Sequence, residues 1–210
     1  MRLPLALGAV LALNLQPAAA AEDYSFEWNE ARFAQVAAAD AAEGKKLAKQ
    51  FRCKKCHNDD GISDDPEIPS IAGQRTTYMY KQLMDFKHEV REDSDMRKVA
   101  RKMSEDDMIH VSAWYESLER PAMIGGEPLL VVKVCDSCHE KDTVEEDNKI
   151  EVAPILKGQV PQYLEATMMA FKDADRSNDL FERMQSVSHK LTDDEIRSLA
   201  RYYGTEPLEE

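Results

Sequence analysis

The sequence predicts an all-α protein made of two tandem helical domains. The first observation behind this prediction is an internal repeat, because both halves of the chain carry the same succession of motifs, most of them 85 positions apart. The second is that apolar residues recur at helical spacing, whereas no segment alternates between apolar and polar residues as a strand does. We therefore expect each half to be a bundle of three or four helices joined by long loops.

The clearest part of the repeat is the pattern Pro-x-x-x-Gly-Gln, which occupies residues 69–74 and again residues 154–159. In both copies a helix is expected to follow, over residues 77–88 in the first. Four further pairs keep the same offset: Tyr78 and Tyr163, Met84 and Met169, Phe86 and Phe171, Lys87 and Lys172.

A second pair of helices is predicted at the end of each half. Ser104 and Thr192 are typical N-cap residues, and the acidic residues after them suit the positive end of a helix dipole. Glu195 completes a capping box with Thr192, and Asp107 is its shorter counterpart. The expected buried faces are Met108, Val111, Trp114 and Tyr115 in the first half, and Ile196, Leu199, Tyr202 and Tyr203 in the second. A further helix is predicted over residues 40–51.

All four cysteines lie in two Cys-x-x-Cys-His motifs, at residues 53–57 and 135–139. This is the c-type haem attachment signature. Cysteines three positions apart on a helical turn share one face, where both can form thioethers with one macrocycle, and the next histidine can bind the iron. The alternatives are two disulfides or a four-cysteine zinc site, although zinc ribbons do not need a histidine after both pairs. The motifs thus predict two covalently bound haem c groups, on Cys53, Cys56, Cys135 and Cys138, with His57 and His139 as iron ligands.

The repeat also selects a second ligand for each iron. Met96 and Met184 lie seven residues before the residue that precedes the N-cap of the final helix, in what the sequence predicts to be a loop. Met84 and Met169 are equivalent too, but they fall on a predicted helix, and His189 is the remaining histidine rival. A thioether ligand favours ferrous iron relative to a second histidine. With both positions filled, the sites predict electron transfer and no catalytic residues.

Pro69 and Pro154 follow the two haem motifs at equivalent positions. One interpretation is that a backbone carbonyl there accepts a hydrogen bond from the Nδ1–H of His57 or His139 and fixes the orientation of the ring. The other is that both prolines only interrupt the chain before a helix.

The composition of the first residues predicts a segment that is removed from the mature protein. Residues 1–21 read as a signal peptide, with Arg2, an apolar run over 3–15 and small residues at 18–20, although a retained membrane anchor is the alternative. The mature protein is then expected to be soluble and periplasmic, where haem is attached to c-type cytochromes.

We expect an amino-terminal arm over 22–39, the first domain over 40–120, a linker over 121–128 and the second domain over 129–210, with 129–134 starting its first helix. The arm is expected to pack on one domain or to dock a partner.

The formal charge of −13 limits the partners. Residues 22–120 carry 16 basic and 21 acidic side chains, and residues 121–210 carry 10 and 19. Such acidity argues against nucleic acid and anionic membranes, and it favours either a redox protein with a basic docking surface or solubility alone.

The charges near the two motifs differ in sign. The first motif contains Lys54 and Lys55, whereas the second contains Asp136 and is followed by Glu140 and Asp142. Negative charge favours ferric iron, so we expect the second haem to have the lower potential, with an effect limited by solvent screening.

Taken together, residues 40–204 resemble the dihaem cytochrome c4 family. The resemblance rests on two Cys-x-x-Cys-His halves, each with Pro-x-x-x-Gly-Gln, a tyrosine-containing helix, a late methionine and a capped final helix. It implies two class I cytochrome c domains related by a pseudo-twofold axis, with haem edges facing each other, and an electron carrier in the periplasm. The cytochrome subunit of flavocytochrome c sulfide dehydrogenase and the dihaem partners of thiosulfate-oxidising enzymes are similar in architecture.

The resemblance leaves two alternatives for function. The chain can be the cytochrome subunit of a periplasmic sulfur-compound oxidoreductase, or a dihaem peroxidase-like enzyme with one open iron. The duplication argues against the peroxidase, because both halves supply the same late methionine. The acidic segment 58–67, the charged segment between residues 87 and 96 and the arm depart from the family pattern, which leaves the partner open.

Overall fold

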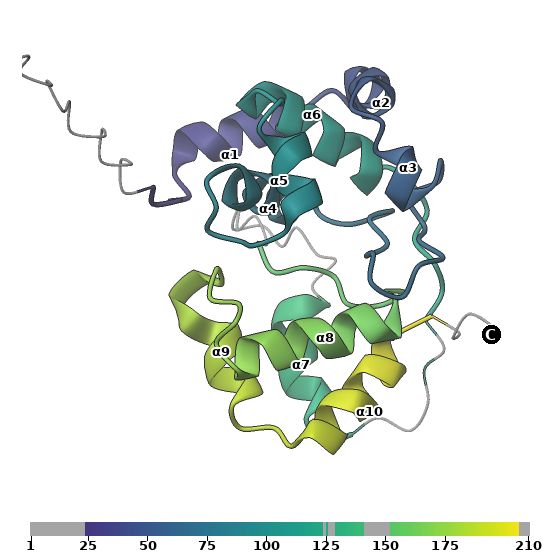
Figure 1. The fold of residues 1–210 in the computed structure, drawn as a ribbon, viewed down its shortest axis with the longest axis vertical. Coiled ribbons are helices and arrows are strands. Elements are labelled where there is room, and N and C mark those ends of the chain that lie inside the picture. Colours follow the sequence, from purple (N-terminus) through teal and green to yellow (C-terminus); the bar gives the residue numbers. More distant parts are fainter. Residues whose placement is uncertain (1–23, 124, 126–128, 141–151, 206–210) are drawn as a thin grey trace, which may run out of the picture.

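The computed structural model describes residues 24–123, 125, 129–140 and 152–205. Figure 1 shows two groups of helices, one formed by the first half of the chain and one by the second. The expected all-α fold is confirmed: the described chain is helical apart from loops and one isolated bridge, between Gln159 and Gly204. The predicted signal peptide and residues 124 and 126–128 of the predicted linker lie outside the described residues. Among the described helices, none has the length and apolar character to cross a membrane.

Most of the predicted helices are present, together with short ones that the sequence did not indicate. The helices expected at 40–51, at 77–88 and after Ser104 and Thr192 are confirmed as α2 (Ala41–Gln50), α4 (Thr76–Lys87), α6 (Glu105–Glu116) and α10 (Asp193–Tyr203). Residues 129–131 form a turn, so the helix expected from residue 129 begins at Val132. The first half contains α1 (Glu30–Ala37), α2 (Ala41–Gln50), α3 (Lys54–His57), α4 (Thr76–Lys87), α5 (Ser94–Ala100) and α6 (Glu105–Glu116). The second contains α7 (Val132–His139), α8 (Pro161–Lys172), the 3₁₀ turn η1 (Leu180–Glu182), α9 (Arg183–Ser188) and α10 (Asp193–Tyr203).

The predicted capping boxes begin both final helices. The Ser104 hydroxyl accepts from the Asp107 N–H at 3.1 Å, and the Asp107 carboxylate accepts from the Ser104 N–H at 2.8 Å. Thr192 and Glu195 make the same exchange at 3.3 and 2.8 Å. Each box supplies hydrogen-bond acceptors for backbone N–H groups that have no partner within the helix. Such a cap contributes about 1 kcal/mol to stability.

The core of the first domain depends on a close approach of α2 to α6. A Cβ atom on Gly44 would lie 1.9 Å from the carbonyl oxygen of His110, so only glycine permits this helix contact. Around the contact, Leu47 and Ala48 of α2 are buried together with Met108 of α6. The residues before α1 add to this core from outside, because Phe26 and Trp28 pack edge-on against Tyr80 of α4, at 5.6 and 5.9 Å between ring centroids. Residues 24–37 therefore lie against the first domain.

The core of the second domain is smaller and centres on α10. Tyr203 is 2% exposed, and its hydroxyl donates to the Asp136 carboxylate of α7 at 2.6 Å. The buried apolar residues of this core are Val132, Leu164, Leu191, Ile196, Leu199, Ala200 and Tyr203.

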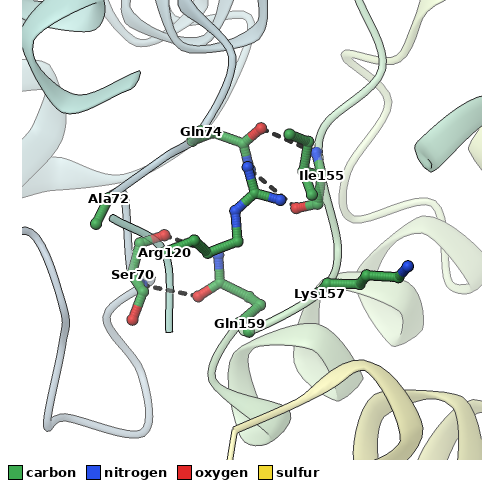
Figure 2. A pocket seen from close by; sticks show the side chains of 8 residues that line it. Ser70, Ala72, Gln74, Arg120, Ile155, Lys157 and Gln159 are labelled. Atoms are coloured by element: carbon green, nitrogen blue, oxygen red, sulfur yellow. Dashed lines mark hydrogen bonds between the residues drawn. The ribbon is translucent and has the colours of Figure 1, made fainter. Parts of the chain in front are cut away.

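The two domains meet through an exchange of hydrogen bonds that repeats on both sides (Figure 2). The Gln159 side chain accepts from the Ser70 N–H at 2.7 Å and donates to the Ser70 carbonyl at 2.9 Å. The Gln74 side chain does the same with Ile155, at 2.9 and 3.0 Å. Gln74 and Gln159 are equivalent in the repeat, and so are Ser70 and Ile155. The interface therefore follows a pseudo-twofold relation.

Two glycines place these glutamines. Gly73 and Gly158 have φ of +63° and +74°, which side chains with a Cβ rarely adopt. Their N–H groups donate to the carbonyls of Tyr115 and Tyr203 at 2.7 and 2.8 Å, so each loop is tied to the final helix of its own domain.

The close contact of α2 and α6 gives a stability prediction. Gly44→Ala should lower the free energy of unfolding by about 1–3 kcal/mol, because the added methyl group cannot fit and α2 must shift. The exposed Ala42→Gly substitution is the control, and it should cost only about 1 kcal/mol through helix propensity. Urea unfolding measures both. Helix propensity alone would make the Gly44→Ala protein at least as stable as the parent. A variant of that stability would contradict the packing described for α2.

Candidate functional site

The four cysteines are divided between the two domains. Cys53 and Cys56 lie at the start of α3 and within it, and Cys135 and Cys138 lie on α7. None is in a disulfide, and the second cysteine of each pair is exposed. Within the described part of the chain no three or more His, Cys, Asp or Glu side chains gather as a metal site would require. The disulfide and zinc alternatives therefore have no geometric support, and each pair lies on a helical turn as haem attachment requires.

The two motif histidines are buried and held in the same way. His57 and His139 are 7% and 6% exposed. Nδ1 of His57 lies 3.0 Å from the Pro69 carbonyl oxygen, and Nδ1 of His139 lies 2.6 Å from that of Pro154. Because a carbonyl only accepts, Nδ1 must carry the proton, and Nε2 keeps its lone pair for a metal. Of the two interpretations of the prolines, the geometry supports the one in which their carbonyls orient the histidines.

Burial also favours the ligating form of the first histidine. It lowers the pKa of His57, and this effect exceeds the opposing influence of the hydrogen bond to Pro69. The imidazole is then neutral at physiological pH, as metal ligation requires.

The two methionines selected by the repeat lie on short helices and not in loops. Met96 is in the first turn of α5, and Met184 is in the first turn of α9. Their N–H groups donate to the side chains of Asp93 and Asp179, at 2.8 and 2.6 Å. The expectation of a loop was wrong because aspartate before residue 96 is itself an N-cap signal. Both methionines are half-buried, and their ligation of iron remains a prediction.

Most rivals for the second ligand have structural roles. Met84 is 2% exposed in the first core, and Met169 packs against the second. His88 stacks on Tyr24 with ring centroids 3.9 Å apart. The other two histidines outside the motifs have different surroundings. Nδ1 of His110 accepts from the Asp40 N–H at 2.9 Å, whereas His189 is exposed at the C-cap of α9.

Sequence reasoning missed one repeat pair at the domain interface, Arg91 and Arg176. Each guanidinium stacks on a phenylalanine of its own domain, Arg91 on Phe86 and Arg176 on Phe171, both at 4.5 Å from the ring centroid. The two arginines are 85 positions apart, so the offset that revealed the other pairs would have revealed this one.

Two helical domains, each with a Cys-x-x-Cys-His turn and a carbonyl-oriented buried histidine, define a c-type cytochrome. The family model for cytochrome c matches residues 41–119. Cytochrome c4 of Pseudomonas aeruginosa is 30% identical, over 79% of this chain and 88% of the relative. The thiosulfate dehydrogenase electron acceptor of Stutzerimonas stutzeri is 28% identical, over 79% of this chain and 87% of the relative. The crystal structure of reduced recombinant cytochrome c4 from Pseudomonas stutzeri superimposes with a TM-score of 0.68 at 26% identity, over 79% of this chain and 97% of that one.

The chain belongs to the cytochrome c4 family. It is therefore an electron carrier that binds c-type haem, and not an enzyme. The expected similarity to the cytochrome subunit of flavocytochrome c sulfide dehydrogenase remains a prediction.

The surroundings of the two motifs differ as their sequences indicate. Asp136 is half-buried and accepts from Tyr203, whereas the equivalent Lys54 is exposed and pairs with Asp59 at 3.2 Å. The carboxylate of the second motif is thus less screened than the charges of the first.

This difference predicts the order of the potentials. Asp136→Asn should raise the potential of the second haem by roughly 30 mV, about threefold in the equilibrium between the haems, because removal of the carboxylate destabilises ferric iron. Lys54→Gln is the control, and it should change the first haem by much less. Resolved spectroelectrochemical titrations measure both. If the potential of the second haem is the same in Asp136→Asn as in the wild type, this carboxylate does not determine which haem has the lower potential.

Proposed function

We propose that the chain is a periplasmic dihaem c-type cytochrome that carries electrons between redox proteins through two His/Met-ligated haems. The observation that best supports the proposal is the hydrogen bond from each motif histidine to a proline carbonyl, which occurs at equivalent places in both domains. The proposed ligands are Cys53, Cys56, His57 and Met96 for one haem, and Cys135, Cys138, His139 and Met184 for the other.

The residues have separate tasks in this proposal. The proline carbonyls fix the tautomer and the plane of His57 and His139, so that Nε2 is the only nitrogen able to bind a metal. The soft thioethers of Met96 and Met184 would supply the second iron ligand in each domain and stabilise the reduced state. Bound haem iron supplies reversible one-electron chemistry. With a histidine and a methionine side chain supplied to each iron, no coordination position would be left for a substrate.

The ligand assignment gives a direct prediction. Met184→Ala should let carbon monoxide bind one of the two ferrous haems, because it removes the thioether that blocks the iron. Met169→Ala is the matched control, since Met169, like its neighbour Met168, lies on α8 and packs against the second core. Carbon monoxide difference spectra measure binding, and the near-infrared sulfur-to-iron band of the ferric protein reports the loss of ligation. If Met169→Ala opened the haem and Met184→Ala did not, the assignment would be wrong.

We propose a periplasmic sulfur-compound oxidoreductase as the electron donor. The support is the relative named as a thiosulfate dehydrogenase electron acceptor, which aligns over most of this chain. The excess of acidic residues, larger in the second half, fits a donor that docks through a basic surface.

A reduction assay tests the donor. Oxidised holoprotein mixed with thiosulfate and catalytic thiosulfate dehydrogenase should be reduced at both haems, and the rate should fall as salt screens the attraction between the partners. Dithionite gives the full reduced spectrum as the reference. Reduction no faster than without the dehydrogenase would contradict this donor while leaving the carrier function intact.

A further inference from the structure

The surface around the first haem motif has the opposite charge to the chain as a whole. Residues 45–55 contain six basic side chains and no acidic one, although the formal charge of the chain is −13. These side chains lie on α2, on α3 and on the turn between the two helices, at the right-hand side of the first domain in Figure 1. All six are exposed and are called here the basic surface: Lys45, Lys46, Lys49, Arg52, Lys54 and Lys55.

Half of the basic surface has no acidic partner. Across the described residues, Lys49, Arg52 and Lys55 have no carboxylate oxygen within 4.0 Å. Of the other three cations, two make exposed ion pairs and one lies over an aromatic ring. Exposed ion pairs are weak because solvent and salt screen them. The positive charge of this surface is therefore available to an external anionic group.

Arg52 occupies a backbone position that favours glycine. Its φ is +63°, in the left-handed region. Its N–H donates to the carbonyl of Lys49 at 3.2 Å, and the N–H of Cys53 donates to that of Ala48 at 3.1 Å, which are the paired bonds by which a helix commonly ends at glycine. An arginine at this position costs stability, and across the described residues no ion pair of its side chain offsets that cost. A function for the positive charge accounts for the choice of residue.

The second haem motif has no counterpart of the basic surface. When the two motifs are aligned on their cysteines, residues 127–137 correspond to residues 45–55, and they contain one basic and two acidic residues. Val134 takes the place of Arg52, and Asp136 takes the place of Lys54. Because both motifs are proposed to attach haem, cations around the motif are not a requirement of attachment. The basic surface is specific to the first domain.

The basic surface adjoins the place where the first haem would be attached. Arg52 directly precedes Cys53, and two of the lysines separate Cys53 from Cys56. Cys56 is exposed, so the edge of a macrocycle joined to it would lie near the molecular surface. A protein bound to the basic surface would therefore approach this edge closely, as electron transfer requires.

We propose that the basic surface docks the electron acceptor of this cytochrome, and that the acceptor is a redox protein with an acidic surface. The inference rests on the proposed function, because it requires haem in the first domain. The expected order of potentials makes the first haem the one of higher potential, so electrons leave the molecule from this domain. One electron then passes from its ferrous iron, which becomes ferric, to the oxidised centre of the acceptor, which is reduced.

Donor and acceptor then dock on different domains through opposite charges. The proposed donor has a basic surface and matches the second half of the chain, where the excess of acidic residues is larger. The charge of −13 opposes nucleic acid and anionic membranes at the basic surface. A second copy of this chain, bound through its acidic half, would make a head-to-tail contact that extends into chains of molecules unless its rotation closes a ring. The position of the basic surface beside the haem edge favours the acceptor.

Reversing two charges outside the haem motif tests the proposal. The probe is an acidic plastocyanin, a blue-copper protein, titrated in its reduced form into the reduced holoprotein so that no electron moves. At about 0.1 M ionic strength, Lys49→Glu/Arg52→Glu should weaken binding at least about tenfold, because distant charges are screened and the local surface determines the attraction. Backbone amide chemical shifts measure the Kd, and haem content and circular dichroism report folding.

Lys190→Glu/Arg201→Glu is the matched control. It also reverses one lysine and one arginine, both exposed, but in the second domain. The net charge changes by the same amount, so binding of the acidic plastocyanin should weaken by less than about twofold if the basic surface is the docking site. Equal weakening in the two double variants would overturn the proposal, because net charge alone would then account for it.

Electron transfer gives a second measurement. When oxidised plastocyanin is mixed with the reduced holoprotein, the rate of haem oxidation should fall with added salt in the wild type and in the control variant. In Lys49→Glu/Arg52→Glu the rate should be lower, and it should rise with salt because both proteins are then acidic at the contact. A wild-type rate that rises with salt would contradict docking through the basic surface.

Two further outcomes would assign the basic surface to another partner. Sedimentation of the holoprotein alone reveals a second copy as the occupant, if a salt-sensitive association is lost in Lys49→Glu/Arg52→Glu. Co-sedimentation with vesicles that contain phosphatidylserine reveals an anionic membrane, if binding is lost in the same variant. Either result, together with plastocyanin binding that this variant leaves unchanged, would overturn the acceptor assignment.

The failure of this inference can be told from failure of the proposed function. Loss of the near-infrared sulfur-to-iron band in the wild-type protein would contradict His/Met ligation whatever the charge variants do. An intact band with the same plastocyanin affinity in the wild type and in Lys49→Glu/Arg52→Glu would contradict only the acceptor site.

Discussion

Two buried glutamines hold the two domains in one relation. Each glutamine side chain hydrogen-bonds both the backbone N–H and the carbonyl of one residue in the other domain, Gln159 with Ser70 and Gln74 with Ile155. Buried backbone groups must find partners, so this exchange specifies how the domains meet as well as holding them together. The residue before Ser70 is Pro69, whose carbonyl orients His57, and in the second domain Pro154 precedes Ile155 in the same way. One short segment per domain thus orients a histidine proposed to bind iron and makes the domain contact.

This coupling suits a carrier of two electrons better than two independent cytochromes would. Any movement of one domain against the other would pull on the segments that hold the histidines. The arginine pair and the buried Lys81–Asp85 ion pair lie at the same interface, so its electrostatics can act on both sites. The domains are nevertheless unequal, because Asp136 is half-buried in one motif and Lys54 is exposed in the other. The two domains are similar in fold but differ in the charges near their haem motifs. A difference in potential that follows from these charges would give electron transfer within one molecule a preferred direction.

The sequence was most informative where structure is local. Capping boxes, the helices after them and the haem motifs depend on residues within four positions, and those predictions are confirmed or supported by geometry. The proline carbonyls could be anticipated because they recur at the same offset. The short helices α1, α5 and α9 escaped prediction, since six to eight residues give too few turns for apolar periodicity. The glutamine partners are 81 and 89 positions away, and no local pattern encodes such contacts.

If the glutamine exchange makes the two domains one cooperative unit, urea unfolding of a Gln74→Leu/Gln159→Leu double variant should uncouple them. Leucine leaves the backbone groups of Ser70 and Ile155 buried without partners, at about 1–3 kcal/mol for each group. With haem absorbance and circular dichroism as separate probes, we expect one shared transition for the wild type and two separated transitions for the variant. The exposed Gln50→Leu substitution should leave the single transition intact. A double variant that unfolds in one transition with the wild-type midpoint would show that the glutamine exchange does not couple the domains.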